Sequence, residues 1–201
     1  SVDASKVLEN KRDKIRKLHP HLDQSKISFK DVSVFEMDYE NEFDIIFSWE
    51  TFEHIMNPKE ALARIYKALK PGGIVFSQYN PFFCISGGHS MCTLDFPFAH
   101  TMLTNEDFKK YVETVVPENP PSKYSELSYN FFTKNLNRMT QSNLTKYIND
   151  VGFELVNFMS TPDLNLLNVI DDSTLDSAKT IHPTLTLNDL LCSNVFFIGR
   201  K

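Results

Sequence analysis

Three stretches of the chain carry apolar residues at helical spacing, with charged residues on the opposite face. They predict helices over residues 5–18, 58–70 and 140–152. Each is bounded by residues that favour helix ends. These residues are Ser5, Asn57 and Thr140 at the N-caps, and Pro20, Gly72 and Gly152 after the C-terminal ends. The charges around the first helix mix both signs and lack interleaved aromatic residues, which indicates a solvated face.

Short apolar runs before, between and after these helices predict strands. They cover residues 27–29, 43–48, 73–78, 153–158 and 194–198. The run over 43–48 does not alternate with polar residues, which is typical of a strand buried on both faces of a parallel sheet. Strand, helix and strand joined by short turns give right-handed crossovers, so the pattern predicts an α/β fold with a mostly parallel sheet.

Two stretches interrupt this alternation, residues 81–139 and residues 160–190. The first is rich in aromatic residues, glycine and proline, and it reads as a long irregular insertion. Long insertions inside a compact domain are usually lids or binding segments. We therefore expect a single domain over 1–201, with a lid or substrate insertion at 81–139 and a second, loop-rich insertion at 160–190.

Composition narrows the function classes. The 201 residues carry a formal net charge of −5, which disfavours a general nucleic-acid binder because such proteins present a basic surface. No apolar run is long enough to span a bilayer, and no signal-peptide pattern opens the sequence, so we expect a cytoplasmic protein without a membrane partner. The three scattered cysteines favour neither a disulfide framework nor a metal site.

One continuous segment carries a resemblance to a known family. Residues 43–78 read FDIIFSWETFEHIMNPKEALARIYKALKPGGIVFSQ. This segment closely resembles the class I S-adenosylmethionine-dependent methyltransferases, in which the pattern spans the fourth strand, the next helix and the fifth strand. The passage Val151-Gly152-Phe153-Glu154 is similar to the family's entry into the sixth strand. The resemblance implies a Rossmann-like, doubly wound sheet whose last strand, over 195–198, is antiparallel.

The same alignment implies that the sheet is incomplete at the N-terminus. Residues 1–5 look like the end of the family's second strand, and no GxGxG motif occurs in the sequence. The first strand, its glycine-rich loop and the following helix are therefore expected to be absent from this chain. Its cofactor half would then be incomplete and its acceptor half intact.

The resemblance implies S-adenosyl-L-methionine as the cofactor and assigns residues to it. They are Asp3 for the ribose, Asp31 and Val32 for the adenine, and Ser48, Trp49 and Glu50 where the fourth strand ends. A carboxylate suits a ribose diol because it offers two acceptor oxygens. Alternatives stay open: Asp3 as an exposed residue at a helix entry, Glu36 or Asp38 in place of Asp31, and Trp49 as a core or surface residue.

His54 is the candidate general base, since its ordinary pKa lies near neutrality and its loop follows the fourth strand. The alternative is a structural histidine hydrogen-bonded within the loop. Further candidates at the substrate site are Tyr79, Asn80, His89 and His100. The stretch over 79–83 also resembles the NPPF signature of nucleobase amino-methyltransferases, but it follows the fifth strand and lacks the second proline. No metal is expected.

These observations predict S-adenosylmethionine-dependent methyl transfer to a small-molecule acceptor at oxygen. The two insertions would enclose that acceptor. Methyl transfer from a sulfonium needs alignment, exclusion of water and removal of a proton from a hydroxyl acceptor. Two alternatives remain open. One is a non-catalytic methyltransferase-like module that stabilises a partner, and the other is an N-methyltransferase.

Overall fold

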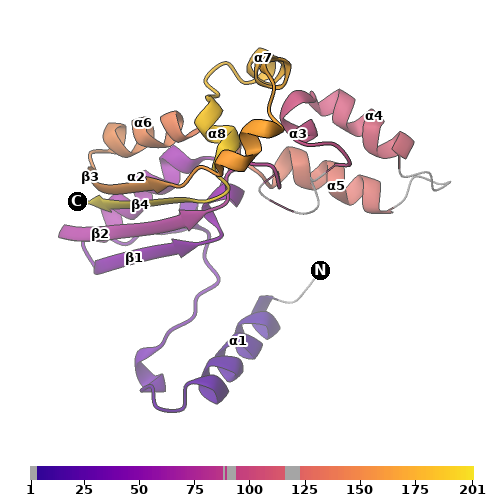
Figure 1. Cartoon of the computed structure of the whole chain (residues 1–201). Helices are drawn as coiled ribbons and strands as arrows, with labels where there is room; N and C mark the ends of the chain where they lie inside the picture. The colour runs from indigo at the N-terminus through magenta and orange to yellow at the C-terminus, as the bar shows by residue number, and fades with distance from the viewer. Residues whose placement is uncertain (1–3, 88, 90–93, 116–122) are drawn as a thin grey trace. The chain divides into compact units, whose positions relative to one another are not determined.

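A computed structural model describes residues 4–87, 89, 94–115 and 123–201, and the chain divides into two compact units. The first, Ser1–Asp38, contains α1 (Ala4–Leu18), η1 (Gln24–Lys26) and η2 (Val34–Glu36) (Figure 1). The predicted strand at 27–29 is wrong, because no strand is formed there. A three-residue apolar run needs a neighbouring strand to satisfy its backbone. Here the Arg12 guanidinium instead donates to the Phe29 carbonyl at 3.3 Å.

The second unit, Tyr39–Lys201, is built on a sheet. Its described strands are β1 (Phe43–Trp49), β2 (Leu69–Tyr79), β3 (Glu154–Ser160) and β4 (Val195–Arg200). They lie in the order β1-β2-β4-β3, with β1 parallel to β2 and with β4 antiparallel to both of its neighbours. The predicted mostly parallel α/β sheet with an antiparallel last strand is confirmed.

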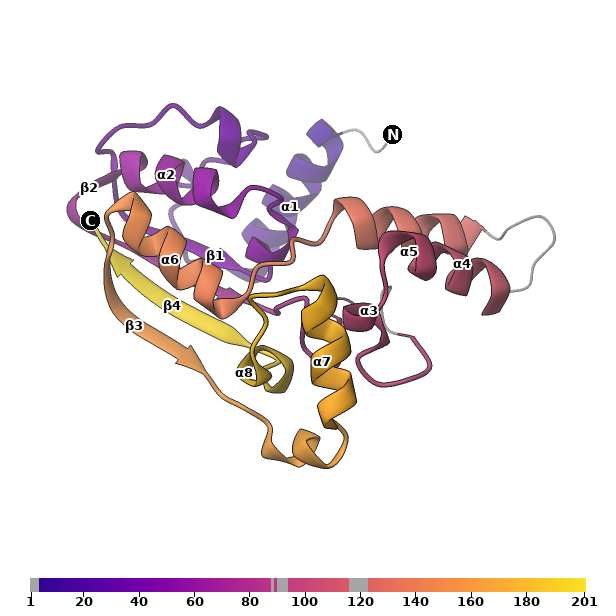
Figure 2. The ribbon, with the colours of Figure 1, turned by 90° about the horizontal axis from the view of Figure 1, so that it is seen from above.

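Two helices, α2 (Pro58–Ala68) and α6 (Gln141–Val151), lie side by side along the sheet (Figure 2). Their apolar stripes are buried: Ala61, Leu62, Ile65 and Ala68 from α2, and Leu144 and Ile148 from α6. Three of the predicted helix ends form, whereas Ser5 lies inside α1 and Leu69 rather than Gly72 caps α2. The Asn57 side chain accepts from the Glu60 amide, the Thr140 side chain accepts from the Asn143 amide, and Gly152 ends α6 at φ 103°.

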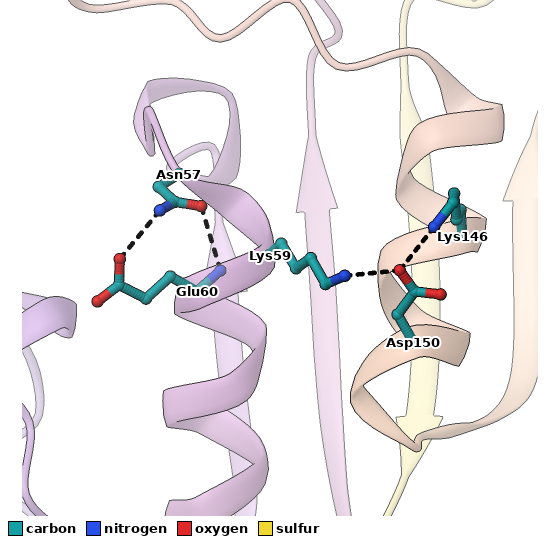
Figure 3. A network of polar contacts seen from close by, with 5 residues as sticks. All are labelled: Asn57, Lys59, Glu60, Lys146 and Asp150. Atoms are coloured by element: carbon teal, nitrogen blue, oxygen red, sulfur yellow. Dashed lines mark hydrogen bonds and ion pairs between the residues drawn. The ribbon is translucent and has the colours of Figure 1, made fainter.

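Polar contacts on the outer surface join these helices (Figure 3). Asp150 of α6 accepts from Lys59 of α2 at 2.6 Å and from Lys146 of its own helix at 2.7 Å. At the start of α2, Asn57 also donates to the Glu60 carboxylate at 2.9 Å. These side chains are partly exposed, so the contacts contribute little to stability. Their main effect is to determine that α2 lies beside α6.

Helix α2 ends two residues earlier than expected, and β2 begins earlier and runs longer. The predicted helix included Leu69 and Lys70, but Leu69 is extended and pairs with Phe43 across the sheet. Gly72 adopts φ 78° within this strand. A Cβ at Gly73 would lie 2.9 Å from the Lys70 carbonyl oxygen, so the second glycine allows a close approach of backbone.

Large apolar residues on β1 are exposed to solvent. Ile45, Phe47 and Trp49 alternate along the strand and are 62%, 75% and 57% exposed. Their β2 neighbours in the register are Ile74, Phe76 and Gln78. The Trp49 ring is stacked on Phe76, with ring centroids 6.3 Å apart. We call Ile45, Phe47, Trp49 and Phe76 the open face of the sheet.

The two predicted insertions are helical and share one core, so the expectation of irregular segments is wrong. They form α3 (Ala99–Met102), α4 (Asn105–Val115), α5 (Lys123–Lys134), η5 (Leu164–Asn168), α7 (Asp172–Ile181) and α8 (Leu187–Leu191). We call these elements the cap; they gather beyond the carboxyl ends of β1 and β2 (Figures 1 and 2). The cap core consists of Phe82, Phe83, Phe98, Phe108, Val112, Phe132, Leu136, Ala178, Leu185 and Leu190. Its aromatic residues, which suggested a binding loop, supply buried apolar area instead.

Candidate functional site

The candidate site lies where β1 and β2 end. These strands are parallel and in register, with Ser48 opposite Ser77 and Trp49 opposite Gln78, so their carboxyl ends meet at one edge. Ligands of open α/β sheets bind outside such an edge. The segment after β1 forms the short helix η3 (Phe52–His54), and the segment after β2 leads through Asn80 into the cap.

The turn that leaves β1 is held in an unusual backbone conformation. Glu50 has φ 46°, a left-handed value that non-glycine residues seldom adopt. The Glu50 amide donates to the Gln78 carbonyl at 3.0 Å, and the Thr51 hydroxyl donates to the Trp49 carbonyl at 2.9 Å. Strained residues of this kind cost about 1–3 kcal/mol and cluster at functional sites. These hydrogen bonds therefore hold Glu50 in its left-handed conformation at the edge of the sheet.

Asn137, at the end of the first insertion, clamps η3 from the other side. Its side-chain amide donates to the Phe52 carbonyl at 2.7 Å and to the Ile55 carbonyl at 2.9 Å. Its backbone amide donates to the Glu53 carbonyl at 2.8 Å. Asn137 is itself buried. These bonds connect residues more than 80 positions apart, and they fix the loop that carries Glu53 and His54.

The imidazole of His54 is oriented by the same segment. Its Nδ1 lies 2.7 Å from the Asn135 carbonyl oxygen, and since a carbonyl only accepts, Nδ1 carries the proton. In a neutral ring this leaves Nε2 as a hydrogen-bond acceptor. The rings of His89 and Phe131 lie beside it, with centroids 6.1 Å and 5.6 Å from that of His54. Burial, followed by the neighbouring His54, lowers the pKa of His89. The hydrogen bond of His54 is made to Asn135 of the first insertion rather than within its own loop, and it leaves Nε2 free of that contact.

Two buried polar residues at this edge were missed in the sequence. Glu53 is 2% exposed and Gln78 is 3% exposed. Neither Glu53 Oε2 nor Gln78 Oε1 has a hydrogen-bond partner among the described residues. Burial raises the pKa of Glu53. In the sequence, Glu53 directly precedes the candidate base His54, and apolar Phe52 and Ile55 flank this pair. Such a setting is unusual for a carboxylate and was the signal available.

The structure brings together most of the predicted residues of the second unit. Trp49 and Glu50 are exposed at the edge, and Ser48 Oγ is buried without a partner in the described part of the chain. Tyr79 is fully enclosed, with its ring 6.1 Å from that of Phe52, so its side chain packs in the core. Asn80 is half-buried, and its amide donates to Glu53 Oε1 at 3.5 Å.

The remaining predicted residues are His100, Asp31, Val32 and Asp3. His100 is 1% exposed in the cap, where its Nε2 lies 2.9 Å from the Phe82 carbonyl oxygen and burial lowers its pKa to about 4. Asp31 and Val32 are exposed residues of the first unit. Asp3 lies outside the described residues. The roles given to these four residues stay predictions.

The donor and acceptor groups at the edge suit an organic cofactor. An exposed aromatic ring (Trp49) and a carboxylate (Glu50) are groups that stack on a base or accept from a sugar diol, whereas the Ser48 hydroxyl is buried. Within the described residues, no group of three or more His, Cys, Asp or Glu side chains is placed to hold a metal ion. No helix in that part of the chain has the length and apolar character needed to cross a membrane.

Similarities to known proteins agree with this arrangement. A family model described as a methyltransferase domain matches residues 1–157. Phosphoethanolamine N-methyltransferase 2 from Caenorhabditis elegans is 40% identical over 62 residues, which are 30% of this chain and 14% of that protein. The chain thus spans only a small part of the curated relative that it matches.

One solved structure shares the fold at low identity, and a second gives a lower score. The [4+2]-cyclase SpnF superposes with a TM-score of 0.50 and 13% identity, over 96% of this chain and 62% of SpnF. A putative methyltransferase from Bacillus halodurans gives a TM-score of 0.48 and 14% identity, over 94% of this chain and 78% of that one. The sheet order, the helices α2 and α6 and the family match confirm the resemblance first seen in residues 43–78. The chain belongs to the methyltransferase domain family.

Proposed function

We propose that this protein transfers a methyl group from S-adenosyl-L-methionine to a hydroxyl oxygen of a small molecule. S-adenosyl-L-methionine is the cofactor of the family, as predicted. One observation supports oxygen as the target. The bond between His54 Nδ1 and the Asn135 carbonyl leaves Nε2 as an acceptor beside the sheet edge. A hydroxyl must lose its proton as the new bond forms, and an imidazole with this tautomer is suited to take it.

The cofactor supplies an electrophilic methyl group when it is bound. Within the second unit, Ser48, Trp49 and Glu50 are the residues that we assign to holding it, beside Asp3, Asp31 and Val32 of the first unit. The strained turn at Glu50 and the clamp from Asn137 fix the edge before a ligand arrives, so little ordering is left to be done on binding. The cap lies beyond the same strand ends, where it would exclude water from the reaction (Figure 2).

Substitution of the base tests the proposal. His54→Ala should lower turnover by about 10²–10⁴-fold and leave the affinity for S-adenosylmethionine unchanged, because a general base contributes in that range. Turnover is measured by transfer of labelled methyl groups, and affinity by isothermal titration calorimetry. His19→Ala is the control, since His19 is an exposed histidine of the first unit. A loss smaller than about tenfold would remove His54 as the base and leave His89, His100 or alignment alone.

A nitrogen acceptor is the second candidate, and the similarity to phosphoethanolamine N-methyltransferase 2 favours it. Mass spectrometry of the methylated product distinguishes an ether or ester from a methylamine. A chain that binds no S-adenosylmethionine in the calorimeter would instead be the non-catalytic module. The proposal includes a cytoplasmic location and no nucleic-acid or membrane partner, which rest on the acidic net charge and the absence of a long apolar run in the sequence.

A further inference from the structure

The carboxylate of Glu53 is unusual because it is enclosed without the partners that a buried charge needs. Its Oε1 accepts a long hydrogen bond from the Asn80 backbone amide at 3.5 Å, and its own backbone amide also donates to the carboxylate, whereas its Oε2 accepts no hydrogen bond from the described residues. Buried carboxylates normally accept several hydrogen bonds or pair with a cation. The charged groups that act on Glu53 are His54 and Glu50, and neither is a lysine or an arginine.

A second acceptor lies next to it. The amide nitrogen of Gln78 donates to the Asn80 side-chain oxygen at 3.5 Å, while Gln78 Oε1 has no donor within the described part of the chain. Asn80 thus connects the two side chains, from β2 on one side and from η3 on the other. The result is two buried oxygen atoms, Glu53 Oε2 and Gln78 Oε1, that have no hydrogen-bond donor among the described residues.

The backbone under Glu53 is fixed, whereas the contacts of its side chain are weak. The Asn137 amide holds the Glu53 carbonyl at 2.8 Å, and the Asn137 side chain holds the carbonyls of Phe52 and Ile55. By contrast, both hydrogen bonds that involve Asn80 are at the upper limit of length for such a bond. The backbone of Glu53 is therefore positioned, while its carboxylate and Gln78 are joined to Asn80 through long hydrogen bonds.

From this geometry we infer that Glu53, with Gln78 beside it, binds a positively charged amino group of the acceptor molecule. The inference rests on the proposed function, and it names the substrate class as small molecules that carry an amine. An ammonium group supplies what these oxygens lack: a charge for the carboxylate and up to three N–H donors. His54 follows Glu53 in the sequence and its ring lies beside that of Phe131, so these two rings would give the remainder of such a molecule an apolar surface to contact.

Stability of the ligand-free protein gives the first test. Glu53→Gln keeps the shape of the side chain and removes an unpaired buried charge, so Tm should rise by about 2–4 °C at pH 8. Glu40→Gln, at an exposed glutamate of the same unit, should leave Tm unchanged. A fall in Tm for Glu53→Gln would show that the carboxylate stabilises the fold, and it would overturn the inference.

Binding gives the second test, with tyramine and 4-ethylphenol as probes that differ only by the amino group. In calorimetry with saturating S-adenosylhomocysteine, the wild-type protein should bind tyramine at least about tenfold more tightly than 4-ethylphenol, because tyramine gains one charged pair. Glu53→Gln should abolish this preference. Equal binding of the two probes, or no binding of either, overturns the inference. Weaker binding of S-adenosylhomocysteine by Glu53→Gln also overturns it, since Glu53 would then serve the cofactor.

The binding test is independent of methyl transfer. A protein that prefers tyramine through Glu53 but transfers no methyl group supports the amine site and contradicts the proposed function. A protein that methylates hydroxyl compounds but shows no preference for the amine supports the proposed function and contradicts the amine site.

Discussion

Two regions of the second unit are rich in aromatic residues, and they are used in opposite ways. In the cap, the rings of Phe108 and Phe132 are stacked with centroids 3.8 Å apart, and both residues are fully buried. On the open face of the sheet, Phe47 and Trp49 are mostly exposed. The two regions have similar residue types, so composition does not explain the difference.

The difference lies in what is packed against each region. The cap core is closed because both insertions contribute to it: Phe132 comes from the first, while Ala178 and Leu190 come from the second. The open face has no described element of the second unit enclosing Phe47. An aromatic residue therefore predicts contact with another apolar group. That group can be far away in the sequence, or it can lie outside the second unit. Four substitutions or conditions test this comparison.

The largest effect is expected in the cap. Phe132→Ala removes a fully buried ring that packs on Phe108 and Phe82, so the free energy of unfolding should fall by about 3–5 kcal/mol. Urea denaturation followed by circular dichroism measures it. A loss below about 1 kcal/mol would mean that the cap does not form a packed core, and the contrast with the open face would disappear.

Acid should weaken the cap next. Burial lowers the pKa of His100 to about 4 in the folded state, against an ordinary value of 6.5, so the unfolded chain binds the proton more readily. The contribution of His100 to the free energy of unfolding is complete above about pH 6.5 and is lost as pH falls toward 4. The loss reaches about 2 kcal/mol by pH 5. Urea denaturation at about pH 7.5 and pH 5 measures the change. His100→Gln should reduce this dependence; an unchanged slope would exclude His100 as its cause.

A smaller effect is expected where α2 and α6 meet. Asp150→Asn removes the charge that pairs with Lys146 and Lys59, the two groups that lower the pKa of Asp150 most. The side chains are partly exposed, so we expect only a slight drop in Tm, one that disappears near 1 M salt because exposed ion pairs are screened. A large, salt-independent drop would show that this contact, rather than the buried stripes, holds the helices together.

The smallest effect is expected on the open face. Phe47→Ser should change the free energy of unfolding by less than about 0.5 kcal/mol, since the side chain is 75% exposed. The measurement is the same urea titration used for Phe132→Ala. A loss of several kcal/mol would contradict the comparison directly, because it would mean that this face is covered in solution.

Local signals in the sequence predicted much of the second unit. The caps Asn57 and Thr140 and the end at Gly152 were right, because each depends on hydrogen bonds or backbone freedom within a few residues. The strand that follows α2 was also predicted, although it begins at Leu69 rather than at Gly73. Its first residues pair with β1 across the sheet, a contact that the helical pattern could not reveal.

Non-local contacts explain what the sequence did not predict. The segment 27–29 has strand-like residues, but within the described residues of its own unit it has no strand to pair with, so it remains irregular. The insertions looked irregular because their aromatic residues lack a clear period, and their helices close only against each other. At the site, His54 was found from its motif, whereas Glu53 and Gln78 became notable only through burial and missing partners.

The sequence by itself determined the family, the α/β class and the edge at which the candidate site was sought, because these follow from short motifs and from periodicity. Only the tertiary structure decided which polar groups are enclosed, which tautomer of His54 is held and which aromatic residues form a core. These properties depend on atoms brought together from positions such as Glu53 and Asn137, 84 residues apart, and burial is set by such packing rather than by local pattern.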